Sequence, residues 1–228
     1  MAKENKVASE NSVEALENAL TRTEQYIESN QKSLTIIVIA IIVIIGAYLG
    51  YKKLYLAPME SKAQEQVFSA ERYFEQDSFK LALNGDGNNL GFLSIIDNYG
   101  PTKVANLSHY YAGISYRELG QFEEAIKHLK KFDASDKVIR PIALGAIGDC
   151  YVELEKYADG ASFYKKAAAY DDNSFTAPIY LLKAGVVYEK QGKYSDAIKM
   201  YETIKKEYPQ STEARDIEKY IERAKQVK

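Results

Sequence analysis

The spacing of apolar residues changes along the chain and divides it into segments. From Ser33 to Tyr51 the run SLTIIVIAIIVIIGAYLGY holds 19 residues without a charge. At about 1.5 Å rise per residue this run would extend about 28 Å as a helix, close to the thickness of a bilayer's hydrocarbon core. A buried core helix is the alternative, but helices of soluble proteins typically have a polar face, whereas this run is apolar on all sides. We therefore interpret residues 33–53 as a transmembrane helix.

Residues typical of a membrane interface flank this run. Lys32 precedes it, Lys52 and Lys53 follow it, and Tyr48 and Tyr55 would suit an aromatic belt. No small-residue cleavage site follows, which indicates an uncleaved anchor.

Two glycines, Gly46 and Gly50, form a GxxxG pair inside the run. Such a pair lets another membrane helix approach the backbone closely. Simple tolerance of glycine in membrane helices is the alternative interpretation.

The charges beside the span bear on its orientation. Arg22 and Lys32 lie before it, and Lys52, Lys53 and Lys62 lie after it. Counting positive charges alone favours the C-terminal part in the cytoplasm, by one residue.

The first 32 residues form an acidic tail with four basic and six acidic side chains. Asn11 and Glu14 have the spacing of a helix-start capping pair. Apolar residues then recur at Val13, Leu16, Leu20 and Ile27. This predicts a short amphipathic helix, which either docks a partner beside the membrane or is a solvated, marginal helix.

After residue 105 a helical pattern repeats three times, with small, aromatic and large apolar residues at matching offsets. The first copy has Ala112, Gly113, Tyr116, Gly120, Phe122, Ala125 and Leu129; the second has Ile147, Gly148, Tyr151, Tyr157, Gly160, Tyr164 and Ala167; the third has Ala184, Gly185, Tyr188, Gly192, Tyr194, Ala197, Tyr201 and Pro209. The matching glycines, Gly113, Gly148 and Gly185, are 35 and 37 residues apart. Glu155 stands where the other copies have a turn glycine.

These offsets resemble those of the tetratricopeptide repeat (TPR), a pair of helices repeated about every 34 residues. The small residues would lie where paired helices cross closely, with aromatic side chains beside the crossing. The resemblance implies an all-α chain: a single N-terminal transmembrane helix followed by a TPR α-solenoid.

The remaining segments complete this architecture. Residues 54–105 would form a linking helix and a degenerate first hairpin, residues 106–210 three repeats, and residues 211–228 a capping helix that covers the last apolar face. Within the first hairpin, the segment 84–97, which begins with the insertion 84–91, places Asp86, Asn88, Gly91 and Asp97 on offsets used by calcium loops. Leu90 stands where an oxygen ligand is needed, which favours a plain Gly/Asn turn.

Composition points away from catalysis and from nucleic acid. The net charge is −2, and the chain has one cysteine, Cys150, and two histidines, His109 and His128. These side chains offer no zinc site and no nucleophile beside a base, so we expect no catalytic residues, no metal and no cofactor. Packing is the expected role of His109, whereas His128 is expected at the surface. We expect neither a small-molecule substrate nor nucleic acid as a partner.

A protein-binding groove is the remaining place for function. TPR domains bind partners along the first helix of each pair, and the matching offsets here are Leu107, Tyr110, Ile114, Arg117, Ile142, Asp149, Val152, Ile179, Leu182, Val186 and Glu189. The predicted groove is mainly apolar, which suits apolar peptides or helix faces. Alternatively, the terminal helix or a neighbouring subunit fills it.

The organisation of the whole chain resembles membrane-anchored TPR proteins of Gram-negative bacteria that serve as ancillary subunits of the Sec translocon. The segment QYIESNQKSL before the span, with Tyr26, Ile27, Glu28, Asn30, Lys32 and Leu34, is similar to that family's approach to the membrane. The resemblance implies a cytoplasmic tail, a periplasmic TPR domain, and a complex with the translocon and a membrane-anchored periplasmic peptidyl-prolyl isomerase-type chaperone. The insertion at 84–91 departs from this family.

The sequence thus predicts a non-enzymatic scaffold in the inner membrane, single-pass, that assists protein translocation or periplasmic chaperoning. An assembly factor of another envelope complex, for outer-membrane biogenesis, secretion or division, is the alternative. The orientation implied by the resemblance is opposite to that favoured by charge counting.

Overall fold

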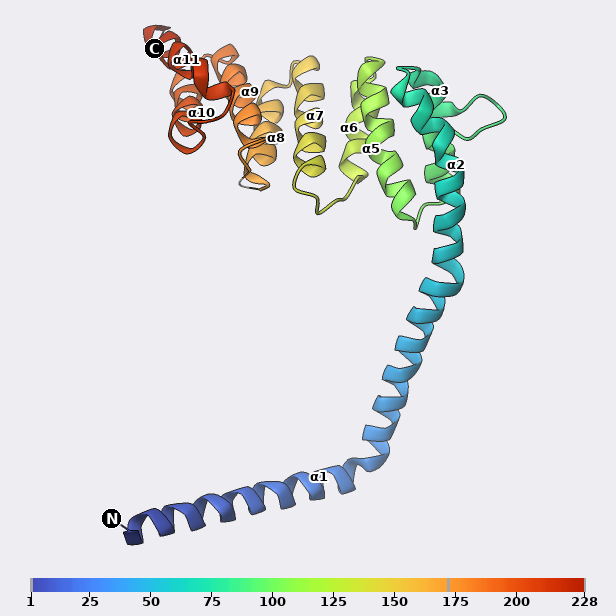
Figure 1. Cartoon of the computed structure of the whole chain (residues 1–228), viewed down its shortest axis with the longest axis vertical. Coiled ribbons are helices and arrows are strands. Elements are labelled where there is room, and N and C mark those ends of the chain that lie inside the picture. The colour runs from blue at the N-terminus through green and yellow to red at the C-terminus, as the bar shows by residue number, and fades with distance from the viewer. Residues whose placement is uncertain (1, 172, 228) are drawn as a thin grey trace. The chain divides into compact units, whose positions relative to one another are not determined.

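The computed structural model of the chain describes residues 2–171 and 173–227 and divides into two units, Met1–Ala57 and Pro58–Lys228 (Figure 1). The first unit holds the helix α1 (Ala2–Gly50) and the π-helix η1 (Tyr51–Leu56). The predicted start of a helix at Asn11 is wrong, because α1 already runs through that position from Ala2; the first residues include the good helix formers Ala, Lys and Glu. The predicted apolar residues Val13, Leu16 and Leu20 lie outside the described side chains.

The apolar run of α1 is exposed along its length. Every large apolar side chain from Ile36 to Leu49 is at least half exposed. Among the described residues one helix, Tyr26–Glu75, is long and apolar enough to cross a membrane, with a mean hydropathy of 2.6 in its most apolar window. Signal sequences share this length and composition.

The π-helix η1 follows the apolar run. Its last turn is closed by the Ala57 amide, which donates to the Lys52 carbonyl five residues back. Pro58 comes next and has no N–H to donate in the α pattern. A wider helical turn beside a proline keeps the neighbouring backbone groups bonded.

The second unit contains a row of helices that follow one another in chain order (Figure 1). Their bounds are α2 (Ala57–Glu75), α3 (Phe79–Asn84), α4 (Phe92–Asn98), α5 (Lys103–Glu118), α6 (Phe122–Lys131), α7 (Ile139–Glu153), α8 (Tyr157–Ala169), α9 (Ala177–Lys190), α10 (Tyr194–Glu207), the 3₁₀ helix η2 (Glu213–Asp216) and α11 (Ile217–Val227). The helices α2, α5, α7 and α9 are the first helices of four hairpins. We call them the first helices below.

Four turns between paired helices share one backbone geometry. One residue in each turn takes a left-handed φ of 55–73°, and these residues are Asp77, Gly120, Glu155 and Gly192. The next amide donates to a tyrosine carbonyl in the first helix, at Ser78–Tyr73, Gln121–Tyr116, Lys156–Tyr151 and Lys193–Tyr188, over 2.8–2.9 Å. This is the Schellman pattern that ends a helix. An aromatic residue then begins each second helix, at Phe79, Phe122, Tyr157 and Tyr194.

Close crossings inside the hairpins explain the repeated glycines. A Cβ on Gly113 would meet Leu129 at 2.5 Å, and one on Gly148 would meet the Tyr164 ring at 2.7 Å. A Cβ on Gly185 would clash with Tyr201 in the same way. The large residue follows the glycine by 16 positions in each repeat, so one contact recurs three times.

The first hairpin has a broken second arm. The degenerate first hairpin predicted from the sequence is found, but its second arm consists of two short helices, α3 before the insertion and α4 after it. The loop between α3 and α4 is a turn held by Asp86, which accepts bonds from the amides of Asn88 at 2.9 Å and Asn89 at 2.6 Å. The Tyr73 hydroxyl donates to the same carboxylate at 2.7 Å. The Gly/Asn turn favoured by the sequence is thus observed.

Apolar side chains form three buried clusters along the row. The first joins α2, α3, α4 and α5, the second joins α5, α6 and α7, and the third extends from α8 to α11. The helix α11 buries Ile217, Ile221 and Ala224 against the third cluster. It therefore covers the end of the row, as a terminal repeat helix must.

Candidate protein-binding site

A pocket of about 660 Å³ opens across the first helices in the middle of the row. Its walls come from α5, α7 and α9, with contributions from the second helices α6 and α8. The lining residues are Arg117, Glu118, Phe122, Asp149, Val152, Glu153, Tyr164 and Lys183. We call this the central pocket.

Asp149 on α7 connects the charges of this pocket. Its Oδ1 lies 2.7 Å from Lys183 Nζ on α9 and accepts a 2.7 Å hydrogen bond from the Tyr164 hydroxyl. Its Oδ2 lies 3.4 Å from Arg117 Nη1 on α5. One carboxylate thus bridges three successive hairpins, and its partial burial strengthens these contacts relative to a surface pair.

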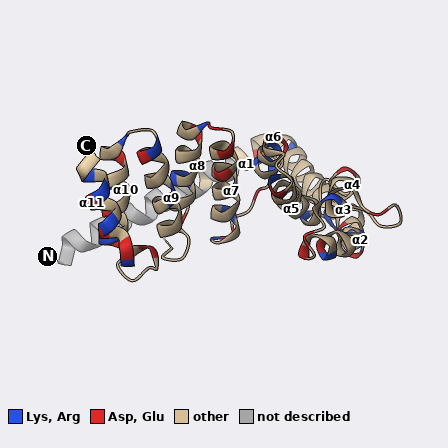
Figure 2. Ribbon diagram, turned by 90° about the horizontal axis from the view of Figure 1, so that it is seen from above, with Lys and Arg blue, Asp and Glu red and all other residues tan. Residues whose placement is uncertain are grey.

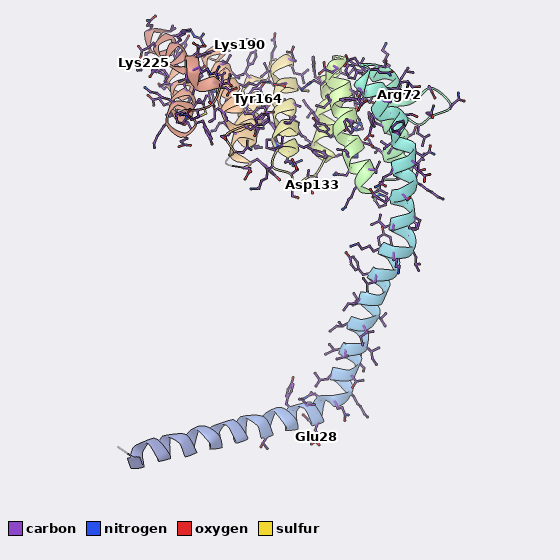
Figure 3. All side chains as sticks on the ribbon, viewed as in Figure 1. Glu28, Arg72, Asp133, Tyr164, Lys190 and Lys225 are labelled. Carbon is purple, nitrogen blue, oxygen red and sulfur yellow. The ribbon has the colours of Figure 1, made fainter. Side chains whose placement is uncertain are left out.

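Tyr164 on α8 positions the Asp149 carboxylate through the hydrogen bond from its hydroxyl. Its side chain is buried, packs against Gly148 and lies in the middle of the row (Figure 3). Burial, and then the neighbouring Asp149 carboxylate, raises the pKa of Tyr164 well above its ordinary value, so the hydroxyl stays protonated and donates.

The surface around the pocket carries both signs of charge. Figure 2 shows Lys, Arg, Asp and Glu distributed along the helices of the second unit. Two cations and three carboxylates line the central pocket. The prediction of a mainly apolar groove therefore does not describe the middle of the row, because five of the eight residues that line the central pocket are charged.

The structure disperses the other predicted groove residues. Arg117, Asp149 and Val152 meet in the central pocket. Leu107 lines a separate groove between α2 and α5. Four further predicted groove residues are half-buried and line neither of these pockets: Tyr110, Ile142, Ile179 and Leu182. Val186 is 44% exposed, whereas Ile114 is only 8% exposed and belongs to the second apolar cluster.

Glu189 is already occupied by the terminal helix. Arg223 of α11 contacts its carboxylate at 2.8 and 3.0 Å, and the Tyr201 hydroxyl donates to it at 2.6 Å. The chain itself thus occupies Glu189 at one end of the predicted groove, while Val186 of the same helix stays exposed and the central pocket is open.

Five contributors to the central pocket were not predicted from the sequence: Glu118, Phe122, Glu153, Tyr164 and Lys183. They were assigned no site role, because repeat offsets describe spacing within a hairpin and not the reach of a side chain between hairpins. The opposite charges of Lys183 and Asp149, on the successive first helices α9 and α7, could have indicated that the two side chains meet.

The two histidines form a pair between α5 and α6. Their Nδ1 atoms lie 3.1 Å apart, so one ring donates and the other accepts. The prediction that His128 lies at the surface is wrong: it is 8% exposed, since α6 turns this side toward α5, where it contacts Tyr116. Burial and then the neighbouring His109 lower the pKa of His128 to about 4. Among the described residues, no group of three or more His, Cys, Asp or Glu is arranged to hold a metal ion.

Repeated hairpins with shared turns, shared crossings and a covered end define an α-helical repeat solenoid. Two family models described as tetratricopeptide repeat match the chain, one at residues 110–174 and one at 180–211. Residues 110–174 and 180–211 therefore carry tetratricopeptide repeats, and solenoids of such repeats typically serve as protein–protein interaction scaffolds.

Solved structures agree with this fold. Nearly identical TPR-like repeats of a Podosopora anserina protein described as a kinesin light chain are 14% identical, with a TM-score of 0.55 over 74% of this chain and 87% of theirs. A MamA protein is 17% identical, with a TM-score of 0.52 over 75% of this chain and 89% of its own. At these identities the likeness concerns the fold alone. No curated protein sequence matches the chain.

Proposed function

We propose that this chain is a scaffold anchored in the inner membrane, with its TPR solenoid in the periplasm, that assists newly translocated proteins by binding partners along its first helices. The observation that carries the proposal is the presence on one chain of an exposed apolar helix and a TPR solenoid with an open central pocket. A helix with every large apolar side chain exposed is unfavourable in water, and a bilayer would cover it.

The short segment before the span supports the identity of the partners. Residues Tyr26 to Leu34 resemble the corresponding segment of translocon-associated TPR subunits. We accordingly propose the Sec translocon and a membrane-anchored periplasmic chaperone of the peptidyl-prolyl isomerase type as partners. We also propose that Gly46 and Gly50 pack against another membrane helix. A Cβ at either position would have no neighbour within 4 Å, so this side of α1 is open to a partner helix.

Crosslinking tests the partners. A photoreactive amino acid in place of Leu182 or Tyr110 should capture translocon or chaperone components in cells. The same substitution at Lys165, which is exposed on α8, serves as the matched control. Recovery of a complex of fixed stoichiometry without the translocon would favour an assembly factor of another envelope machine, and recovery of no envelope protein would contradict both.

Topology is the cheaper test. A reporter that is active only in the periplasm, fused after Lys228, should be active, and the fusion should remain in the membrane at its full length. A shorter fusion in the soluble fraction would instead identify the apolar helix as a cleaved signal sequence. A silent reporter on a membrane-bound fusion would place the solenoid in the cytoplasm.

A further inference from the structure

A second groove lies between α2 and α5 and has one acidic residue, Glu71, in its lining. It has a volume of about 340 Å³ and is lined by Gln64, Val67, Glu71, Val104, Leu107, Ser108 and Tyr111. The three residues from α2 and the four from α5 each follow helical spacing, so two helix faces border the groove. We call it the α2–α5 groove.

The rim of this groove on α2 combines an aromatic ring with two carboxylates. Phe68, Glu71 and Glu75 follow Gln64 at steps of four, three and four residues and therefore lie on one face of the helix. Phe68 is 67% exposed, which is unusual for so large an apolar side chain. It shares this helix face with Gln64 and Glu71, which line the groove.

The carboxylates of this face are not neutralised. Within the described part of the chain, Glu71 makes no hydrogen bond and no salt bridge, although it is half-buried. Glu75 follows it by four residues, where like charges repel on a helix. Burial and then Glu75 raise the pKa of Glu71. The isolated chain thus maintains an unfavourable charge arrangement at the edge of an apolar groove.

We propose that the α2–α5 groove binds a polypeptide segment that carries apolar side chains together with a Lys or Arg, whose cation lies between Glu71 and Glu75. The inference rests on the proposed function and names the chemistry of a partner. Phe68 and the apolar floor would contact the apolar side chains. The cation would remove the repulsion between the two carboxylates, and a partly buried charge pair of this kind is stronger than a surface pair.

Matched peptides test this proposal with the full-length chain in detergent. One fluorescent amphipathic peptide has Leu on its apolar face and Lys on its polar face; its twin has Glu in place of Lys. We expect the Lys peptide to bind about tenfold more tightly or better, a preference that falls with added salt. In the double variant Glu71→Gln/Glu75→Gln the preference should disappear while apolar binding remains.

The control variant Glu123→Gln/Glu207→Gln changes the net charge equally at exposed positions of α6 and α10, and it should keep the preference. Thermal unfolding gives a second measurement: the Glu71→Gln/Glu75→Gln variant should have a higher Tm than wild type, because it loses the repulsion. Equal binding of the two peptides, no binding of either, or a preference that survives Glu71→Gln/Glu75→Gln would overturn the proposal. If Leu182 still crosslinks to an envelope partner in that case, only the charge assignment fails and the scaffold function stands.

Discussion

Single residues set the geometry of each hairpin through the sign of one φ angle. Glycine takes a left-handed φ without strain, whereas a residue with a Cβ pays roughly 1 kcal/mol for it. Two of the four turns use glycine, at Gly120 and Gly192, and two use acidic residues, at Asp77 and Glu155. The turns at Asp77 and Glu155 therefore stabilise the solenoid less than turns with glycine at the same positions would.

Replacing Glu155 with glycine should stabilise the solenoid by about 1 kcal/mol, because the left-handed φ of 57° then carries no steric penalty. Chemical denaturation of the full-length chain measures the change. Lys165→Gly, in the exposed interior of α8, is the control and should destabilise by about 1 kcal/mol. A loss of stability in Glu155→Gly would mean that the Glu155 side chain contributes more than its backbone strain removes.

The three crossings and the turns of the three repeats were predictable at this scale, since each depends on residues within one hairpin, whereas the turn at Asp77 was not predicted. The glycine spacing identified the three crossings, and the absence of a glycine at Glu155 marked a strained turn. The burial of His128 and the role of Lys183 were not predictable. Both depend on which neighbouring helix a side chain reaches, and a repeat pattern along one helix does not contain that distance.

At the scale of helices, the contact between α5 and α6 depends on pH through a pair of histidines. The pair His109–His128 joins α5 to α6, and the charged groups that face it are Lys131, Lys127 and Glu124 on α6 and Asp97 on α4. A proton on each ring would place two cations 3.1 Å apart between Nδ1 atoms. The hairpin therefore favours two neutral imidazole rings joined by one hydrogen bond between their Nδ1 atoms.

Acidification should weaken this hairpin. The folded-state pKa of His128 is lowered to about 4 from 6.5, so the unfolded chain binds more protons between these values. The contribution of neutral His128 to the free energy of unfolding is complete above pH 6.5 and is lost as the pH falls toward 4. Between pH 7.5 and pH 5 the free energy of unfolding should decrease by about 1–2 kcal/mol from this source. Urea denaturation of wild type and His128→Asn measures it, and equal pH dependence of the two proteins would refute the assignment.

The terminal helix α11 stabilises the repeat on which it packs. Ile221→Ala should cost about 2–4 kcal/mol, because Ile221 is 2% exposed in the third apolar cluster. Hydrogen exchange should show α9 and α10 losing protection while α5 and α6 keep it, since a repeat contacts only its neighbours. Val227→Ala, at a 58% exposed position, is the control. Equal loss of protection in every helix would indicate one cooperative core in place of a stack.

Helix identity was largely predictable at this scale, whereas helix bounds were less so. The apolar periodicity located the paired helices of the repeats and the helix that covers the end of the row. The short helix α3 was missed because the insertion after it interrupts the second arm of the first hairpin. The continuity of α1 from Ala2 was missed because a capping pair at Asn11 resembles a helix start but does not prevent a helix from passing through it.

At the scale of the whole molecule, the sequence combines two kinds of surface that need different partners. The exposed apolar face of α1 requires lipid or another apolar environment. The solenoid offers an open charged pocket in its middle, and α11 already occupies Glu189 of the last repeat. The proposed binding of proteins along the middle first helices, with the chain held at a membrane, would account for both.

Site-specific photocrosslinking from Val152, inside the central pocket, tests this account most directly in the membrane fraction of cells. The account predicts discrete protein adducts from Val152 that are absent from Lys165 on the exposed face of α8. It also predicts that these adducts weaken in Asp149→Asn, which loses the charge that joins Arg117 and Lys183. Adducts of equal yield from both positions, or from neither, would contradict it.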